Sequence, residues 1–287
     1  MFQKILIPVD FSDDSWYSIS CLTHLPGIRE ITLLHVIRSA YLIQTPDRVN
    51  PGADYARLRL DELKSAVEFP RFGIRTMIEE VSDGNISDAI IRISGQVMPS
   101  VIIMGRRGKG VIESVLLGST ASDLLTYGHF PLLLLHPPGP RSANTRPQTL
   151  RCPRILDHVM MAVDLNEPVP IHLCLDEMPD TKELTLFHAV TSGDSDDEVQ
   201  RAVAAAKAAL AELAPLCQRP NLTVRMLVRA GDAANEILAV SDELDVSLIM
   251  MKGTSRHGLV QNLLGSTTEV VARTSRRPVY IMKEYHP

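Results

Sequence analysis

The sequence predicts two tandem α/β domains, each a doubly wound parallel sheet with helices on both faces. Three observations predict this fold: the length of 287 residues, an internal repeat, and an alternation of short apolar runs with helical patterns. At roughly 150 residues per domain, this length favours two domains. Runs such as VIIMG (101–105) and LLLLH (132–136) are continuously apolar, as expected for parallel strands buried on both faces.

The internal repeat consists of five short matches in one order. IPVDFS (7–12) returns as MAVDLN 154 residues later, and TLLHVI (32–37) returns as TLFHAV 153 residues later. Three further matches lie at an offset of 147: GNISDAI with GDAANEI, LLGST with LLGST, and PLLLLH with PVYIMK. Such ordered matches indicate a duplicated domain. The falling offset places about six extra residues in the first copy, around Tyr41 to Asp54.

Each copy is expected to contain strands and helices in the same order. In the first copy we predict strands at 4–9, 31–36, 75–80, 101–105 and 132–136, and helices near 14–25, 53–68, 86–97 and 119–127. The clearest helix of the second copy is 198–216, where Ala, Leu and Lys dominate. The aperiodic segment 136–153 is rich in Pro, Arg and polar residues. We therefore predict domains at 1–138 and 154–287, with a linker at 139–153.

Composition narrows the class of protein. The net charge is −5 and the isoelectric point is near 6.0, which argues against a nucleic-acid partner because such proteins normally carry a basic face. The sequence shows neither a membrane-spanning apolar run nor a leader, so we expect a cytoplasmic protein without membrane contact. The cysteines form no C-x-x-C pair, so we expect neither zinc nor a disulfide framework but four ordinary thiols, mostly buried, in a reducing compartment: Cys21, Cys152, Cys174 and Cys217.

Polar and glycine-rich residues follow the first and fourth predicted strands. Asp10 and Ser12 end the first, and GRRGKG (105–110) ends the fourth before LGST (117–120) opens a helix. In doubly wound sheets, ligands lie beyond these carboxyl ends. Glycines let backbone N–H groups approach phosphate, and a helix beginning at Ser119, a natural N-cap, adds a favourable dipole. Arg106, Arg107 and Lys109 add positive charge. The pattern predicts a phosphate cradle, although such a turn taken alone also fits a solvated loop.

The loop is neither a Walker P-loop nor the G-x-G-x-x-G of dinucleotide-binding folds. It resembles the nucleotide loop of the universal stress protein family, which reads G-x-x-G, nine residues, then G-S or G-T. Gly105, Gly108, Gly118 and Ser119 match this motif in full. The resemblance covers nearly the whole chain as two family domains. It implies five-stranded parallel sheets of order 3-2-1-4-5 that bind ATP or a related adenine nucleotide (AMP, ADP).

The resemblance also implies roles for individual residues. Asp10 would contact the adenine or ribose end, and the backbone of Val36 the adenine edge. Arg106 and Arg107 fall at variable positions of the motif, so their phosphate-binding role is inferred from charge. Mg²⁺ bridging the phosphates is compatible with the sequence, which offers no dedicated cage. The remaining expected contacts are Pro8 and Val9 lining the adenine pocket, Met104 and Gly105 beside the ribose, and Gly105, Gly108, Gly118, Ser119 and Thr120 around the phosphates.

The second copy departs from the motif. Lys252 and Ser255 stand at its first two glycine positions, where a Cβ would crowd the backbone against phosphate. Asp164 persists, and Ala189 replaces the valine at the adenine edge. We therefore predict that the first copy binds nucleotide and the second binds it weakly or not at all.

Other polar residues receive structural interpretations. His35 and His188 occupy matching strand positions without a partner that would suggest catalysis. Asp13, Asp14 and Ser15 form an acidic first helical turn, and we assign no metal to them. The run 194–198 (DSDDE) is interpreted as a solvated helix start.

The leading functional hypothesis is a nucleotide-dependent regulatory or interaction module of the stress response, with no catalytic residues assigned. The final apolar strands suggest pairing between the two copies and a possible homodimer. A separate protein partner is also expected, and its identity is unknown. A slow ATPase is the alternative enzyme, disfavoured because the sequence offers no general base beyond Asp10. A nucleotide-free dimeric interaction scaffold is the third hypothesis, favoured only by the lost glycines of the second copy.

Overall fold

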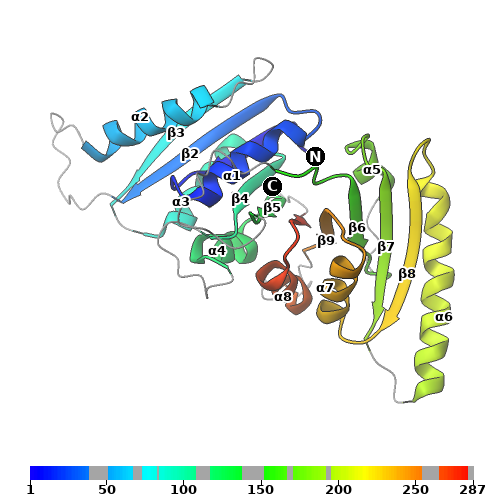
Figure 1. Ribbon diagram of the computed structural model, residues 1–287. Helices are drawn as coiled ribbons and strands as arrows, with labels where there is room; N and C mark the ends of the chain where they lie inside the picture. Colours follow the sequence, from blue (N-terminus) through cyan, green and yellow to red (C-terminus); the bar gives the residue numbers. More distant parts are fainter. Residues whose placement is uncertain are drawn as a thin grey trace. The chain divides into compact units, whose positions relative to one another are not determined.

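The computed structural model describes residues 1–38, 51–66, 73–82, 84–107, 117–137, 152–166, 171–191, 195–253 and 265–283 (Figure 1). The chain divides into two compact units, Met1–Cys152 and Pro153–Lys283, which we call domain 1 and domain 2. Within the described residues, no helix has the length and apolarity needed to cross a membrane.

Domain 1 is a parallel sheet with strand order β3-β2-β1-β4-β5. This is the 3-2-1-4-5 order that the family resemblance implied. Strands β4 and β5 are buried along their whole length, which confirms the prediction from their continuous apolar sequences. Its elements are β1 (Lys4–Pro8), α1 (Asp13–Ser20), the 3₁₀ turn η1 (Cys21–His24), β2 (Glu30–Arg38), α2 (Pro51–Ala66), β3 (Gly73–Val81), α3 (Ile86–Val97), β4 (Val101–Gly105), α4 (Ser119–Tyr127) and β5 (Leu132–Leu135).

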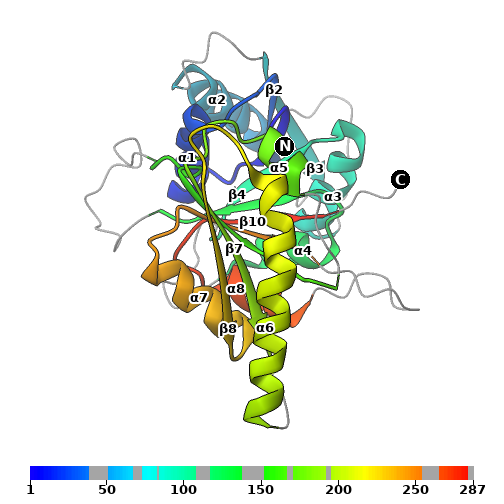
Figure 2. The same cartoon turned by 90° about the vertical axis from the view of Figure 1, so that its right-hand side faces the viewer.

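Domain 2 repeats this sheet in the order β8-β7-β6-β9-β10. Its long helix α6 packs along β8 and β7 (Figure 2). The Ser195 hydroxyl caps this helix by accepting the N–H of Glu198, so the acidic run does open a helix. The elements are β6 (His158–Ala162), α5 (Ile171–Asp176), β7 (Glu183–Val190), α6 (Asp196–Leu213), the 3₁₀ turn η3 (Ala214–Cys217), β8 (Thr223–Ala230), α7 (Ala233–Glu243), β9 (Leu248–Lys252), α8 (Ser266–Thr274) and β10 (Val279–Met282).

Strand registers reproduce the sequence repeat. Lys4 pairs with Glu30 in domain 1, and His158 pairs with Glu183 at the matching place in domain 2. At the other end of the sheets, Gly105 pairs with Leu135 as Lys252 pairs with Met282. The registers therefore confirm that Lys252 stands where domain 1 has Gly105.

The registers also correct the predicted position of the extra residues. Thr32 pairs with Arg75 in domain 1, and Thr185 pairs with Arg225 in domain 2. The chain is three residues longer in domain 1 across this step, and three residues longer again from Arg75 to Gly84 than from Arg225 to Gly231. The extra length is thus divided between the two sides of β3, with three residues before it and three in the turn that follows it.

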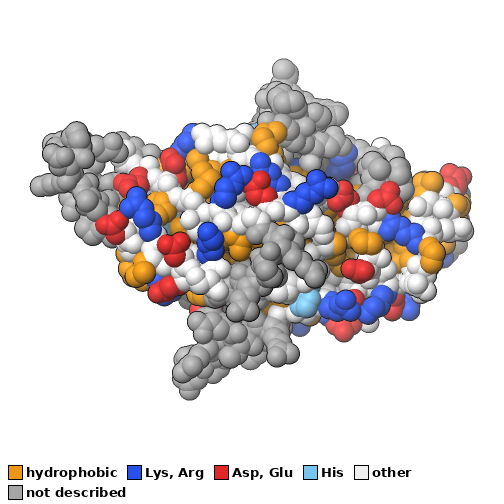
Figure 3. Space-filling model, turned by 90° about the horizontal axis from the view of Figure 1, so that it is seen from above, with side chains coloured by type: hydrophobic (Ala, Val, Ile, Leu, Met, Phe, Trp, Pro, Cys, Tyr) orange, Lys and Arg blue, Asp and Glu red, His pale blue; other side chains and the backbone are white. Residues whose placement is uncertain are grey.

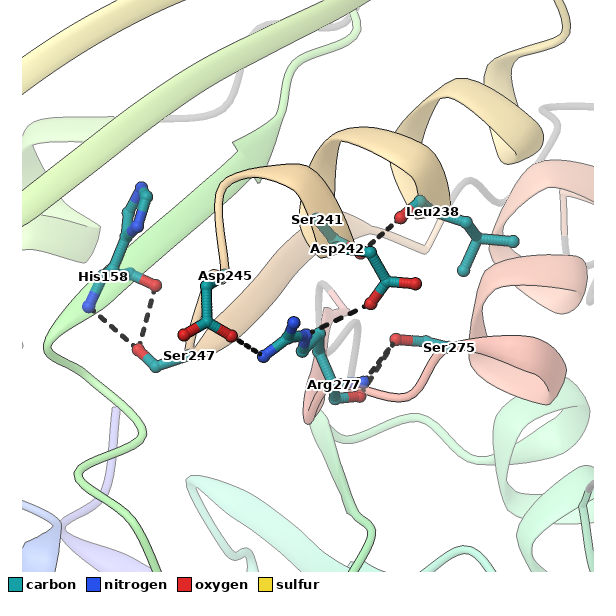
Figure 4. A network of polar contacts seen from close by, with 8 residues as sticks. All are labelled: His158, Leu238, Ser241, Asp242, Asp245, Ser247, Ser275 and Arg277. Carbon is teal, nitrogen blue, oxygen red and sulfur yellow. Dashed lines mark hydrogen bonds and ion pairs between the residues drawn. The ribbon is translucent and has the colours of Figure 1, made fainter. Parts of the chain in front are cut away.

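A serine at the amino end of each sheet joins two neighbouring strands. Ser100 Oγ accepts the N–H of Lys4 at 2.9 Å and donates to the Lys4 carbonyl at 3.0 Å. In domain 2, Ser247 Oγ accepts the N–H of His158 at 2.9 Å (Figure 4). The same Oγ lies 3.0 Å from the carbonyl oxygen of Ile155. These serines fix the strand starts, at the end of each sheet opposite to the candidate site.

Two cysteines contradict the prediction of four free thiols. Cys21 forms a disulfide with Cys152, which lies 131 residues later in the chain. Both residues are almost wholly buried. Sequence spacing gave no sign of this bond, because the end of the linker returns to the carboxyl end of α1 only in the folded chain. Cys174 and Cys217 remain free thiols, as predicted.

Candidate functional site

Asp10 follows β1 and is held by the turn that leads into α1. Its Oδ1 accepts the Ser12 hydroxyl at 2.5 Å, the Ser15 hydroxyl at 2.6 Å and the Ser12 N–H at 3.0 Å. The Asp10 N–H in turn donates to Ser15 Oγ at 3.2 Å. Ser12 is also the N-cap of α1. Hydrogen bonds to a carboxylate are stronger than neutral ones, so this turn fixes the orientation of Asp10 before any ligand arrives.

Phe11 lies in this turn with a backbone conformation that residues with a side chain rarely adopt. Its φ of 59° lies in the left-handed region, which costs a non-glycine residue about 1–3 kcal/mol. The Phe11 ring lies against His35, with ring centroids 4.4 Å apart, and the Arg59 guanidinium carbon lies 5.7 Å from its centroid. These contacts accompany the bend that brings Asp10 and Ser12 together.

The matching histidines have the same structural role in both domains. His35 Nδ1 lies 2.6 Å from the carbonyl oxygen of Val9, and His188 Nδ1 lies 2.8 Å from that of Val163. Because a carbonyl oxygen only accepts, Nδ1 carries the proton in each ring. Each histidine thus ties one strand end to its neighbour, which confirms the structural interpretation.

The glycine-rich loop leaves β4 and returns beside its own start. Arg106 N–H donates to the Leu135 carbonyl at 3.0 Å, and Gly118 N–H donates to the Arg106 carbonyl at 2.7 Å. Gly108 and Lys109 lie outside the described residues. The structure thus places the first and last parts of the predicted cradle in contact.

Helix α4 begins where the loop returns, but its N-cap was predicted one residue too late. Gly118 is the N-cap, without a side-chain cap bond, and Ser119 is the first helical residue. The hydrogen bond from Gly118 to Arg106 sets the chain's direction, so helical geometry starts directly after it. Ser119 is exposed and Thr120 half-buried. Backbone N–H groups of this first turn have no intrahelical acceptor and favour an anion.

Asp14 is more than part of an acidic helical turn, which corrects our interpretation. Its side chain is 1% exposed, and its Oδ2 accepts the N–H of Arg107 at 3.1 Å. A Cβ added to Gly105 would lie 2.3 Å from Asp14 Cβ, closer than real atoms approach. The glycine at 105 is therefore required by the packing of α1 on the loop, whatever the loop binds. Sequence alone gave no signal for this contact, which joins residues 93 positions apart.

Arg106 is buried beside this carboxylate, with 2% of its surface exposed. Burial lowers the pKa of its guanidinium to about 10, and the charge of Arg107 acts in the same direction, while Asp14 raises it. Arg106 therefore remains charged at neutral pH, and Asp14 offsets part of that charge. The positive potential that we predicted for the loop is correspondingly smaller than two arginines would give.

The other predicted residues come from the carboxyl ends of adjacent strands. Val9 N–H donates to the Leu34 carbonyl at 2.8 Å, and Val9, Val36 and Met104 are buried. Pro8 pairs with Leu34, and β1 also pairs with β4. Strands β2, β1 and β4 thus bring Val36, Asp10 and Gly105 to one edge, where such sheets bind ligands. The described residues include no group of three or more His, Cys, Asp or Glu side chains that could hold a metal ion.

The corresponding edge of domain 2 is built differently. Asp164 Oδ1 accepts the Asn166 N–H at 2.9 Å, and α5 begins seven residues after this aspartate whereas α1 begins three residues after Asp10. Gly253 N–H donates to the Met282 carbonyl, and a Cβ on Gly253 would lie 3.0 Å from Ile281 Cγ2. Packing against β10 thus accounts for Gly253. Ser255, Arg256 and His257 lie outside the described residues.

Charged side chains of both signs lie on the face of the molecule seen from above (Figure 3). Figure 3 shows acidic and basic side chains side by side on one face of the molecule. Several form exposed ion pairs, such as Arg57 with Asp54 and Arg277 with Asp245. Such pairs contribute little to stability, about 0–1 kcal/mol each.

Two doubly wound domains in one chain, the first with a polar edge built from Asp10 and the two ends of a glycine-rich loop, define a class of tandem α/β proteins. A profile of the universal stress protein family matches residues 1–136 and 158–283. The chain therefore belongs to the universal stress protein family.

Individual relatives match along nearly the whole chain. Universal stress protein Rv2623 of Mycobacterium tuberculosis is 24% identical over 298 residues, covering 98% of this chain and 96% of the relative. The crystal structure of a universal stress protein from Archaeoglobus fulgidus aligns with a TM-score of 0.64 at 21% identity, covering 99% of this chain and 97% of that one. A putative universal stress protein from Pseudomonas aeruginosa aligns with the same TM-score at 17% identity, covering 98% and 93%. These structures share the fold.

Proposed function

We propose that domain 1 binds an adenine nucleotide, ATP or AMP, and that the protein is a cytoplasmic regulatory or interaction module of the stress response. The observation that carries this proposal is the edge formed by β1 and β4. There, Asp10 is held in one orientation by three hydrogen bonds to Oδ1, beside a loop whose two ends meet through Gly118 and Arg106.

The two ends of a nucleotide match the two parts of this edge. Asp10 offers a fixed carboxylate to ribose hydroxyls or the adenine amino group, and the Val36 backbone lies one strand further along. The first turn of α4, from Ser119, offers N–H groups and a positive dipole end to phosphate. Arg107 adds a half-buried charge. A Mg²⁺ ion, if bound, would be held by phosphates and water, since it keeps several water ligands.

The arrangement favours binding over rapid hydrolysis. Asp10 Oδ1 is engaged by Ser12 and Ser15, and the Asp14 carboxylate accepts the Arg107 N–H. A general base must reach the proton that it removes, either directly or through one water molecule. Both carboxylates already accept hydrogen bonds that hold the turn and the loop, so we propose that the nucleotide acts as a signal.

In domain 2 we propose weak binding or none. Lys252 carries a side chain at the register position of Gly105, and α5 starts seven residues after Asp164, whereas α1 starts three residues after Asp10.

Nucleotide content tests this proposal. Small molecules are released from freshly purified protein by denaturation and quantified per chain by mass spectrometry. We expect one adenine nucleotide per chain, lost in Gly118→Val and retained in Gly265→Val, which makes the same change at the N-cap of α8 in domain 2.

Each other outcome favours a different function. Absence of nucleotide, with no shift of the melting temperature on adding ATP, would replace this proposal with an interaction scaffold. Two nucleotides of equal affinity per chain would refute the assignment of binding to domain 1 alone. Repeated release of phosphate from added ATP would indicate an ATPase.

A further inference from the structure

The disulfide between Cys21 and Cys152 joins the end of α1 to the boundary between the two domains. Cys21 is the first residue of η1, directly after α1, and Cys152 is the last residue of domain 1 before the boundary. Three residues later, Ile155 is fully buried in domain 2, and its carbonyl oxygen accepts the Ser247 hydroxyl. The bond therefore lies immediately beside the junction of the two domains.

The bond determines how much chain connects the domains. When it is closed, only Pro153 and Arg154 separate Cys152 from Ile155, a reach of about 10 Å at most. When it is open, Pro137 is the last described residue of domain 1 before Cys152, and the chain from Pro137 to Ile155 can reach about 60 Å at most. One covalent bond thus changes severalfold the maximum length of the chain that connects the domains, which we call the interdomain tether.

The sheet itself does not depend on such a bond. Domain 2 has the same five-stranded order, and both of its cysteines are free thiols. Cys152 lies outside any helix or strand, so its release breaks no strand pairing. What the bond adds is the attachment of the boundary to α1.

We propose that Cys21 and Cys152 form a reversible thiol–disulfide exchange site, for which the substrates are low-molecular-weight disulfides and thiols such as glutathione, and that its redox state sets the length of the interdomain tether. This inference goes beyond the proposed nucleotide binding and does not depend on it.

The exchange proceeds in two steps. Cys152 is almost wholly buried, so the irregular segment that contains it must first open locally. Its thiolate then attacks a small disulfide, which releases one small thiol and leaves a mixed disulfide. Cys21, held in η1, then attacks the Cys152 sulfur and releases the second small thiol. Overall, two cysteine thiols lose two electrons and two protons, and one small disulfide is reduced to two thiols. An excess of small thiol reverses both steps.

The tether is tested by cutting the chain between its two attachment points. A recognition site for a sequence-specific protease is inserted between Asn144 and Thr145 of the full-length protein. The cut protein is equilibrated with glutathione at a series of reduced-to-oxidised ratios, quenched with acid, alkylated, and separated by electrophoresis without reductant.

We expect one joined species at the oxidised end of the series and two separate fragments at the reduced end. Cys152→Ser should give two fragments throughout, while Cys174→Ser and Cys217→Ser, which remove the free thiols, should behave like the parent. Fragments that separate at every ratio would overturn the proposal, as would fragments that stay joined even in excess reduced glutathione.

Nucleotide content is measured on the same samples, so the two proposals fail separately. A ratio-dependent joined species without bound nucleotide would sustain the tether and refute the binding function. Bound nucleotide with fragments that never join would support the binding function and refute the disulfide exchange.

Discussion

At the scale of the residue, Gly105 shows that a motif glycine can be required by packing. A Cβ at this position would lie 2.3 Å from Asp14 Cβ. We expect Gly105→Ala to separate α1 from the loop, destabilise domain 1 by about 1–3 kcal/mol and weaken nucleotide binding at least tenfold. Thermal denaturation and calorimetric titration with ATP measure the two effects.

Gly95 is the matched control, because it lies exposed in α3 with no atom near its absent Cβ. Alanine there should stabilise domain 1 by about 0.5–1 kcal/mol and leave binding unchanged, since it lowers the entropy of the unfolded chain. If Gly105→Ala instead retained full stability and affinity, the close packing of α1 against the loop would be wrong.

A substitution at Ser15 tests whether the orientation of Asp10, rather than the stability of α1, determines nucleotide affinity. Its hydroxyl donates to Asp10 Oδ1 at 2.6 Å, whereas Ser18, one turn further along α1, donates to the Asp14 carbonyl. We expect Ser15→Ala to weaken nucleotide binding about tenfold, equivalent to roughly 1.4 kcal/mol, by freeing the carboxylate. Ser18→Ala should leave affinity unchanged in the same titration. Equal losses of nucleotide affinity in both variants would show that binding depends on the stability of α1 and not on the hydrogen bond from Ser15 to Asp10.

At the scale of the element, apolar patterns and the repeat identified the strands and helices of domain 1. Strands β4 and β5 were the clearest, because burial on both faces leaves a continuous apolar run. The long-range contacts lay beyond such local patterns. The Asp14 carboxylate meets Arg107 only after β1 and β4 pair, and Cys21 meets Cys152 across 131 residues. Residue preference predicts Ser119 as the helix cap, whereas Gly118 is the N-cap in the structure. Local sequence thus predicted the helices and strands, whereas the contacts of Asp14 and Cys21 depend on how distant segments of the chain pack together.

The start of strand β6 contains a histidine that should make domain 2 sensitive to acid. Burial lowers the pKa of His158 below its ordinary 6.5, with Arg225 acting in the same direction, and Glu183 and Asp245 opposing. Below about pH 6.5 the unfolded chain therefore binds a proton that the folded domain excludes, so stability falls as the pH falls. Above that pH neither state holds the proton, and the histidine contributes no further change.

Denaturation of domain 2 from about pH 8 to about pH 5 measures this dependence. His158→Gln, which keeps a polar group near the Thr185 hydroxyl that now lies 2.9 Å from Nε2, should flatten the curve. His24→Gln, an exposed change in domain 1, should not. A curve for His158→Gln as steep as that of the parent would assign the acid sensitivity to other groups.

At the scale of the whole molecule, the proposed binding of nucleotide by domain 1 alone implies that a ligand stabilises the two domains unequally. Each domain has its own buried sheet, so calorimetry should resolve two unfolding transitions. Gly105→Ala should lower the transition of domain 1, and acid should lower that of domain 2, which assigns each one. ATP at a hundred times its dissociation constant should then stabilise the domain 1 transition by about 2.7 kcal/mol, or roughly 10 °C, and leave the other in place. Equal shifts of both transitions would have two explanations: either Lys252 is compatible with binding, or the domains unfold as one unit. The Gly265→Val variant distinguishes them, because it would abolish the shift of the domain 2 transition alone only if domain 2 itself binds nucleotide.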